Sequence, residues 1–411
     1  MKESSSPKSP ASLFITIGVV LVHVIIIGAI VWGCSSRSGK KGGNDGGKDA
    51  AATTEADDIA PANRHYRVPS ANPNFGKPLD FGTADRRSPD NFLPGLTEWK
   101  GTGIIVDMDN HKVLWEKDAQ KPVPVASMVK MMTALLVAEE LERNPNLSLD
   151  TEITITDSAR GAIRDRGAKL MPELDVGRKI TVGDLLRCVL VCSANDAANQ
   201  LAEVVAGNVD KFIEVMNNRA RELGLNPRTK FYTANGLNDI RGKEILTSVA
   251  SAADMVTIAE RLLEYPFVLE MTSSKAARID ISGQKVTIRT TNILLDPSIA
   301  KKQLRGLKPI PGVDGMKTGY IERSGACLTF SVLRNGRRMI GCVTNFRGHP
   351  NRYNFCRRLI DWAYDPASLK KVPSKPQPAK PGVKKTGKAT KAAPKKTGKA
   401  TKSDGKNQKK K

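Results

Sequence analysis

The stretch SMVKMMTALLVAEELERN, residues 127–144, decides the fold of this chain. It is long, apolar and rich in helix-forming residues, and it opens with serine, which is favoured at the start of a helix. The pattern predicts a buried helix. Because residues three positions apart share one face of a helix, Lys130 lies on the same side as Ser127, in surroundings that hold little water.

The pairing of Ser127 with Lys130 indicates nucleophilic chemistry. Burial disfavours the charged ammonium and lowers the pKa of Lys130, so that the neutral amine takes a proton from the serine hydroxyl. The four histidines of the chain lie outside any motif typical of a Ser-His-Asp triad. A helix N-cap serine beside a surface lysine is the structural alternative.

Strands are expected at both ends of the same domain. Residues 101–119, GTGIIVDMDNHKVLWEKDA, alternate apolar and polar side chains around a turn, which is typical of a hairpin. Residues 312–320, 325–334 and 337–346 indicate three further strands, the last two joined by an Asn-Gly turn. Predicted helices lie between these two groups. The fold class is therefore α+β, with an antiparallel sheet built from both ends and a helical cluster.

Two more sequence patterns bear candidate site residues. The loop between predicted helices 181–192 and 196–207 holds Ser193 and Asn195, whose hydroxyl and amide groups are suited to a cleft; a Ser-Asn turn that caps the next helix is the alternative. A Lys-Thr-Gly tripeptide begins at Lys317 in a predicted strand, where glycine leaves room for a peptide beside the strand edge. An edge strand with a protective lysine is the alternative explanation.

The order Ser-x-x-Lys, Ser-x-Asn, Lys-Thr-Gly is the signature of penicillin-binding proteins and class A β-lactamases. The segments ASMVKMMTALLV, SANDAANQLAE, GLNPRTKFYTANGL and VDGMKTGYIERSGACL are similar to the D-alanyl-D-alanine carboxypeptidases at greater length. These enzymes are low-molecular-weight penicillin-binding proteins of the serine peptidase S11 family. The resemblance covers residues 92–364 and implies a DD-peptidase/β-lactamase-like domain.

The resemblance implies that the chain removes the terminal D-alanine from peptidoglycan stem peptides, that β-lactam antibiotics inhibit it, and that it uses no cofactor and no metal. Ser127 would attack the carbonyl between two D-alanines and carry the acyl group. Lys130 would be the general base, and Ser193 would relay a proton to the leaving group.

The same resemblance implies a set of substrate-binding residues. Asn195 would hold a substrate amide, and Lys317 with Thr318 and Gly319 would lie near the carboxylate end. The backbone amides of Ser127 and Tyr320 would form the oxyanion hole. Arg347, in VTNFRGHP, matches the position of an arginine that binds the terminal carboxylate, although a solvated loop arginine is the alternative.

Three other functions share part of this pattern. A DD-endopeptidase or transpeptidase has the same motifs and differs in its acceptor. A class A β-lactamase needs a deacylating glutamate segment, which the sequence does not show. A non-catalytic penicillin-sensing or wall-binding protein would not need the pair Ser127 and Lys130.

The N-terminal part indicates a bacterial membrane protein. After a short segment, 1–12, the run LFITIGVVLVHVIIIGAIVW holds 20 uncharged residues, enough to cross a hydrocarbon core of about 30 Å. We expect an anchor at 13–33, with a cleaved signal or lipidation of Cys34 as alternatives. A polar, glycine-rich linker is expected at 34–90, before a catalytic domain at 91–366 outside the cytoplasm, in the periplasm.

The predicted tail, 367–411, is strongly basic. It holds sixteen lysines and one aspartate and repeats KKTGKATK, so it is expected to be disordered. It has no aromatic residue for stacking on bases, so we expect no specific nucleic-acid binding. Anionic lipid headgroups or wall polymers are the partners that its charge favours. Two further copies of Lys-Thr-Gly in this tail follow from the repeat.

Overall fold

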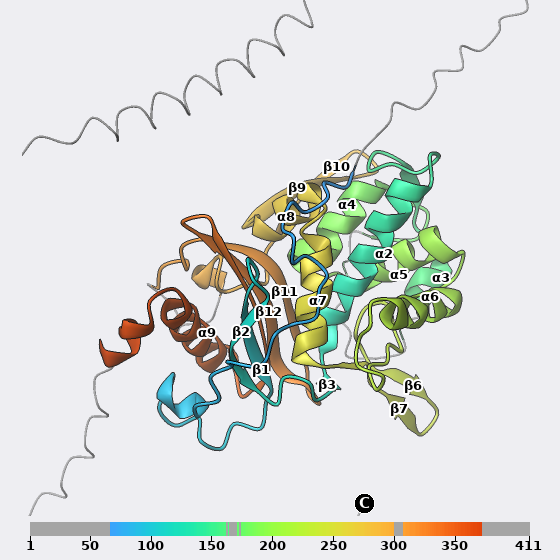
Figure 1. Cartoon of the computed structure of the whole chain (residues 1–411). Coiled ribbons are helices and arrows are strands. Elements are labelled where there is room, and N and C mark those ends of the chain that lie inside the picture. The colour runs from blue at the N-terminus through green and yellow to red at the C-terminus, as the bar shows by residue number, and fades with distance from the viewer. Residues whose placement is uncertain (1–65, 162, 164–170, 172–173, 300–306, 372–411) are drawn as a thin grey trace, which may run out of the picture. The chain divides into compact units, whose positions relative to one another are not determined.

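A five-stranded antiparallel sheet lies at the centre of the domain (Figure 1). The computed structural model describes residues 66–161, 163, 171, 174–299 and 307–371. The order of the strands is β11-β12-β13-β1-β2, so the pairing of β1 with β13 joins the two ends of the domain. The predicted α+β class is confirmed. The strands are β1 (Gly103–Asp107), β2 (Lys112–Lys117), β11 (Val313–Ile321), β12 (Gly325–Arg334) and β13 (Arg337–Phe346).

Helices cover both faces of this sheet. The helix α9 (His349–Tyr364) packs on one face, while α7 (Ala252–Leu262) lies on the other, between the sheet and α2 (Lys130–Arg143) (Figure 1). The alternation of β1 sets these layers, because Ile104 belongs to the core beneath α2 and Ile105 to the core beneath α9. The core under α9 is rich in aromatic residues, whereas that around α2 is mainly aliphatic.

The other described elements are shorter helices, turns and two-stranded sheets. The helical ones are α3 (Asp157–Gly161), α4 (Val182–Arg187), the π-helix turn η3 (Cys188–Cys192), α5 (Asn195–Ala206), α6 (Val209–Glu222), α8 (Pro266–Ser273), and the 3₁₀ turns η1 (Pro89–Asn91), η2 (Ala126–Val129), η4 (Pro297–Ile299) and η6 (Pro366–Lys371). The two-stranded sheets pair β3 (Val123–Pro124) with β8 (Val249–Ala250), β4 (Glu152–Thr154) with β5 (Lys179–Thr181), β6 (Asp239–Arg241) with β7 (Glu244–Leu246), and β9 (Ala276–Ile281) with β10 (Gln284–Arg289).

Residues 66–90, which we call the strap, are part of the domain and correct the predicted linker 34–90. The strap, blue in Figure 1, runs beside α7 to the edge of the sheet. The Asp80 N–H donates to the His111 carbonyl at 2.9 Å and the Val113 N–H to the Asp80 carbonyl at 2.8 Å. The sequence did not predict the pairing of the strap with the sheet. Isolated backbone bridges to an edge strand do not require the alternation of apolar and polar residues by which a strand is recognised.

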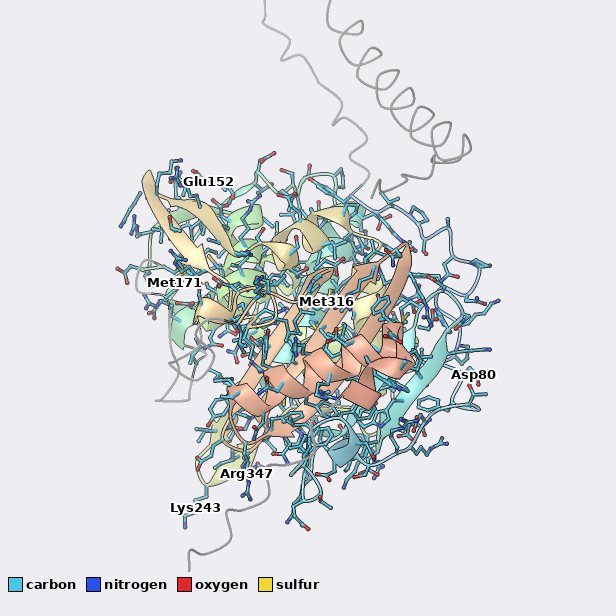
Figure 2. All side chains as sticks on the ribbon, turned by 90° about the vertical axis from the view of Figure 1, so that its left-hand side faces the viewer. Asp80, Glu152, Met171, Lys243, Met316 and Arg347 are labelled. Carbon is cyan, nitrogen blue, oxygen red and sulfur yellow. The ribbon has the colours of Figure 1, made fainter. Side chains whose placement is uncertain are left out.

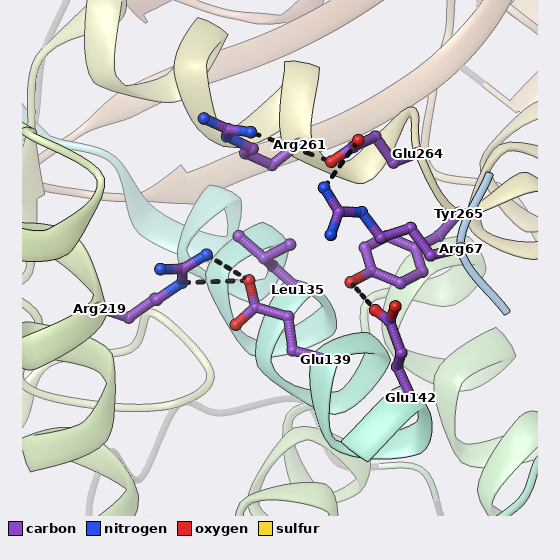
Figure 3. Close-up of a pocket in the computed structure, with 8 residues that line it drawn as sticks. All are labelled: Arg67, Leu135, Glu139, Glu142, Arg219, Arg261, Glu264 and Tyr265. Carbon is purple, nitrogen blue, oxygen red and sulfur yellow. Dashed lines mark hydrogen bonds and ion pairs between the residues drawn. The ribbon is translucent and has the colours of Figure 1, made fainter. Parts of the chain in front are cut away.

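The start of the strap is clamped at a charged pocket of about 240 Å³ (Figure 3). An Arg67 Nη donates to Glu264 Oε1 at 2.9 Å, and the Tyr265 hydroxyl donates to Glu142 at 3.2 Å. Three arginines and three glutamates offset each other around this pocket, so its lining is close to neutral. The full lining is Arg67, Leu135, Glu139, Glu142, Arg219, Arg261, Glu264 and Tyr265.

The predicted anchor at 13–33 and most of the predicted tail lie outside the described residues. No helix within the described ranges is long and apolar enough to cross a bilayer. At the other end, η6 continues the described structure past the predicted boundary at 366.

We expect Glu264→Ala to lower the free energy of unfolding by about 2–3 kcal/mol, because it removes a buried charged acceptor for Arg67 and for the Ser70 N–H. The control is Glu222→Ala, whose exposed pair with Arg219 contributes about 1 kcal/mol at most. Urea unfolding of both full-length variants measures the difference. Equal losses in the two variants would show that the strap is not held at this point.

Candidate active site

Ser127 lies in the 3₁₀ turn η2, which precedes α2. The turn is held between two glycines from distant parts of the chain. A Cβ on Gly236 would lie 2.1 Å from the Ala126 carbonyl oxygen, and one on Gly319 would lie 2.6 Å from the Val125 carbonyl oxygen. Neither position has room for a side chain. The serine is therefore presented by a tightly packed turn, and the alternative of a helix N-cap does not hold, because Val129 is the N-cap of α2.

The amine of Lys130 is buried beside Ser127. Its Nζ lies 3.1 Å from Ser127 Oγ, 2.7 Å from Asn195 Oδ1 and 2.6 Å from the Asn235 carbonyl oxygen. Burial lowers the pKa of Lys130 well below its usual value, and the positive charge of Lys317 lowers it further. Burial and the charge of Lys317 thus both favour the neutral amine over the ammonium form, in the direction that the apolar helix predicts.

The three contacts of Lys130 also direct its lone pair. A neutral amine has two N–H groups and one lone pair. The carbonyl oxygen of Asn235 and the amide oxygen of Asn195 only accept hydrogen bonds, so each takes one N–H. The lone pair is left facing Ser127 Oγ, which is the arrangement a general base needs.

Ser193 and Lys317 form a second serine–lysine pair. Ser193 follows the π-helix turn η3 in a left-handed conformation, with φ 65°. Lys317 Nζ donates to Ser193 Oγ at 2.8 Å and to the Thr318 carbonyl at 2.9 Å. Burial lowers the pKa of Lys317 to about 7. Near neutral pH this lysine changes readily between a proton donor and a neutral amine.

The strand β11 supplies the remaining predicted residues on that side. The hydroxyl of Thr318 lies 2.6 Å from that of Thr291. Gly319 was expected to leave room for a peptide, but its Cα faces the carbonyl of Val125, so the turn η2 requires the glycine. This contact places the backbones of Tyr320 and Ser127 on adjoining segments. The Tyr320 side chain is 60% exposed.

Arg347 lies at the end of β13, at the periphery of the domain (Figure 2). It is exposed and makes no ion pair within the described residues. The register pairs Tyr320 with Ala326 and Ala326 with Phe346, so Arg347 follows the same row of residues across the sheet. The ring of Tyr320 lies 6.0 Å from that of His349, which connects this end of β13 to the strand of the candidate site.

Sequence reasoning missed three residues that contact the site. Asn235 and Asn199 are buried, and Asn235 accepts from Lys130. The segment that contains Asn235 took part in the family resemblance, so a signal was present but gave no role. Thr291 had no signal, because its contact with Thr318 depends on how the loop after β10 folds.

Comparisons with known proteins agree with this geometry. A family model described as D-alanyl-D-alanine carboxypeptidase, peptidase S11, matches residues 99–348. D-alanyl-D-alanine carboxypeptidase DacF of Bacillus subtilis is 28% identical over 264 residues, which cover 64% of this chain and 61% of the relative. DacC of Escherichia coli is 30% identical over 64% of this chain and 60% of its own length. The chain thus spans about three fifths of these relatives.

Solved structures give the same result. Penicillin-binding protein D2 of Listeria monocytogenes, in its cefotaxime-bound form, is 29% identical with a TM-score of 0.53; the match covers 64% of this chain and 96% of that one. PBP3 of Streptococcus pneumoniae is 30% identical with a TM-score of 0.55, over 64% of this chain and 72% of that one. These matches confirm the predicted DD-peptidase-like fold. The chain belongs to the D-alanyl-D-alanine carboxypeptidase family, peptidase S11.

Proposed function

We propose that this protein is a serine-type D-Ala-D-Ala carboxypeptidase that removes the terminal D-alanine from peptidoglycan stem peptides. The observation that carries the proposal is the buried Lys130 amine, whose Nζ lies 3.1 Å from Ser127 Oγ and whose other two contacts are acceptors. A nucleophile and a general base are thus in contact without substrate. The second pair, Ser193 with Lys317, supplies the proton transfer that the leaving group needs.

In the acylation step, Ser127 Oγ attacks the carbonyl carbon between the two D-alanines while its proton moves to Lys130 Nζ. The oxyanion is stabilised by the backbone amides of Ser127 and Tyr320. The C–N bond then breaks, and the proton that Lys130 took passes through Ser193 to the nitrogen of the leaving D-alanine, which leaves Lys130 neutral again. Water hydrolyses the ester, with its proton taken again by Lys130, and the serine is restored.

The substrate carboxylate fits the cationic side of the site. Lys317 and Thr318 are consecutive residues of β11, and Lys317 contacts Ser193, two residues before the Asn195 that contacts Lys130. Arg347 would add a guanidinium, which binds a carboxylate through two parallel hydrogen bonds. Binding of β-lactam antibiotics follows from the same groups, since these carry a carboxylate beside a reactive carbonyl. The Listeria relative is known in cefotaxime-bound and ampicillin-bound forms.

A DD-endopeptidase or transpeptidase is the second candidate. The D-alanyl-D-alanine endopeptidase of Escherichia coli is 25% identical, and the match covers 76% of its length, against 60% for the carboxypeptidase DacC. The matched region is therefore a larger share of the endopeptidase. The same two serine–lysine pairs serve either reaction, and the difference lies in which amine leaves or attacks.

We also infer that the catalytic domain works outside the cytoplasm of a bacterium, attached through an N-terminal anchor at 13–33, with lipidation of Cys34 as the alternative. The uncharged 20-residue run supports the anchor. The linker then spans 34–65, since residues from 66 belong to the domain. The lysine-rich tail after η6 would contact anionic lipid or wall polymer through its charge.

Incubation with a pentapeptide ending in D-Ala-D-Ala should release D-alanine, and incubation with a labelled penicillin should give a covalent adduct. Ser127→Ala should abolish both, because it removes the nucleophile. Ser282→Ala is the matched control, since Ser282 and Lys285 form another Ser-x-x-Lys on the exposed β9–β10 hairpin. Absence of both products with the wild-type protein would refute the proposed activity. To separate the second candidate from the carboxypeptidase, an acceptor amine is added and a cross-linked product is sought.

We expect Lys130→Met to lower the rate of penicillin acylation by about 10²–10⁴-fold, because it removes the general base but keeps the volume of the side chain. The exposed Lys230 gives the control Lys230→Met, which should acylate at the wild-type rate. Acylation is followed by stopped-flow fluorescence or gel labelling. A wild-type rate in Lys130→Met would assign the base to another group.

The pH dependence of peptide hydrolysis should be bell-shaped. The rate rises with pH as Lys130 loses its proton, because only the neutral amine accepts one from Ser127. It falls as pH rises through about 7, where Lys317 loses the charge that holds the carboxylate. A peptide with a terminal carboxamide should lose the descending limb. If both peptides give the same descending limb, Lys317 does not act through the carboxylate.

A further inference from the structure

The segment 233–236, Thr-Ala-Asn-Gly, lies against the general base, and we call it the brace. Its contact with the base is the Asn235 carbonyl oxygen, 2.6 Å from Lys130 Nζ. Nothing in this contact requires a particular side chain at 235, since the backbone supplies the acceptor. Asn235 is nevertheless 2% exposed, and both the nitrogen and the oxygen of its side-chain amide are hydrogen-bonded. The asparagine side chain therefore has a structural role separate from that of the carbonyl.

The side chain of Asn235 fixes the peptide that carries this carbonyl. Its Nδ2 donates to Asn199 Oδ1 at 3.1 Å, and its Oδ1 accepts the Leu237 N–H at 2.8 Å. Asn199 is held in turn, because its own Nδ2 donates to the Ala159 carbonyl at 2.9 Å. Donor and acceptor roles along this chain of amides are therefore consistent from α3 to the brace.

The other members of the brace lock it to α2. Thr133 lies one turn after Lys130 on the same face of α2, and its hydroxyl donates to the Ala234 carbonyl at 2.6 Å. Two consecutive carbonyls of the brace thus accept from two side chains of one helix. The Gly236 N–H donates to the Thr233 hydroxyl at 3.0 Å, and the absence of a side chain at Gly236 lets the brace touch the turn of the nucleophile.

Both acceptors of the Lys130 amine are consequently tied to one helix. Asn195 and Asn199 lie four residues apart on α5, hence on the same face. Asn195 accepts from Lys130 directly, and Asn199 holds the residue whose carbonyl accepts the second N–H. Motion of the brace would release one N–H and let the lone pair turn away from Ser127 Oγ.

We propose that Asn235 is a positioning residue for the general base: it fixes the carbonyl that directs the lone pair of Lys130 at Ser127. This rests on the proposed serine peptidase function of the site. The titratable groups that face Lys130 are Lys317 from β11, Cys192 from η3 and Asp196 from α5. Displacing the Asn235 carbonyl from Lys130 Nζ destabilises the ammonium form, so it adds to the effect of burial and of Lys317 on the pKa of Lys130.

The test is penicillin acylation by the full-length protein from pH 5 to pH 10. At each pH the dependence of the rate on penicillin concentration separates noncovalent affinity from the acylation rate. We expect Asn235→Ala to lower the plateau rate by about 10²-fold, as for a reacting group displaced by about 1 Å, with little change in affinity. Its ascending limb should move to lower pH. Asn199 does not contact Lys130. Asn199→Ala should therefore lower the plateau rate and move the ascending limb to lower pH by smaller amounts than Asn235→Ala.

The matched control is Asn217→Ala. Asn217 is also buried, and its amide holds the Phe231 backbone in the segment that leads to the brace. It should lower the melting temperature while leaving the rate per folded molecule and the pH profile as in the wild type. This separates loss of packing from misdirection of the amine.

The outcomes distinguish failure of the positioning role of Asn235 from failure of the proposed serine peptidase function. A wild-type protein that neither reacts with penicillin nor releases D-alanine refutes the function. A reactive wild-type protein with unchanged plateau and ascending limb in Asn235→Ala refutes the positioning role. If Asn235→Ala does not fold, as judged by circular dichroism, Asn199→Ala decides: a slower plateau with a shifted limb supports the role, and a wild-type profile overturns it.

Discussion

The burial of one lysine amine against neutral oxygen atoms is the interaction on which the site depends. Lys130 is 0% exposed, and Ser127, Asn195 and Asn235 each present an oxygen to its Nζ. A buried ammonium with these contacts is poorly stabilised relative to water, so the amine is available as a base. The surrounding elements are arranged to keep it there, since α2 supplies the lysine and α5 and the brace supply the acceptors.

The two lysines of the site are coupled by their charges. Protonation of Lys317 disfavours protonation of Lys130, so the state with one cation between them is favoured. That state suits the proposed chemistry, because a cation on β11 holds a carboxylate while the amine on α2 accepts a proton. The second serine, in contact with Lys317, offers a path along which the proton reaches the leaving group.

Local patterns in the sequence predicted the central parts of this arrangement. The apolar helix placed Lys130 beside Ser127, and alternation in the terminal segments predicted the strands that pair as β1 and β13. The chemistry of that pair of side chains follows from spacing along one helix, which is a local property. Sequence patterns also singled out Ser193 and Lys317, and the family resemblance gave them roles; their contact joins residues 124 apart in the sequence.

What the sequence did not predict depends on contacts between distant segments. The Asn235 carbonyl reaches a lysine 105 residues away, and a backbone group leaves no mark on residue type. The strap pairs with the sheet through isolated bridges at Asp80 and Asp85, so its polar composition resembled that of a linker. The end of the predicted helix 181–192 is a π-helix turn, which changes the direction of Ser193 without changing the apolar pattern.

The two glycines that enclose the turn of the nucleophile have a consequence for how such a site diversifies. Gly236 and Gly319 leave no space to shift the turn, so its geometry is shared by any reaction that uses Ser127. Exposed side chains such as those of Tyr320 and Arg347 lie outside this enclosed turn. A substitution at either glycine would therefore be felt at Ser127 through the backbone, whereas a substitution at an exposed side chain leaves this backbone packing as it is.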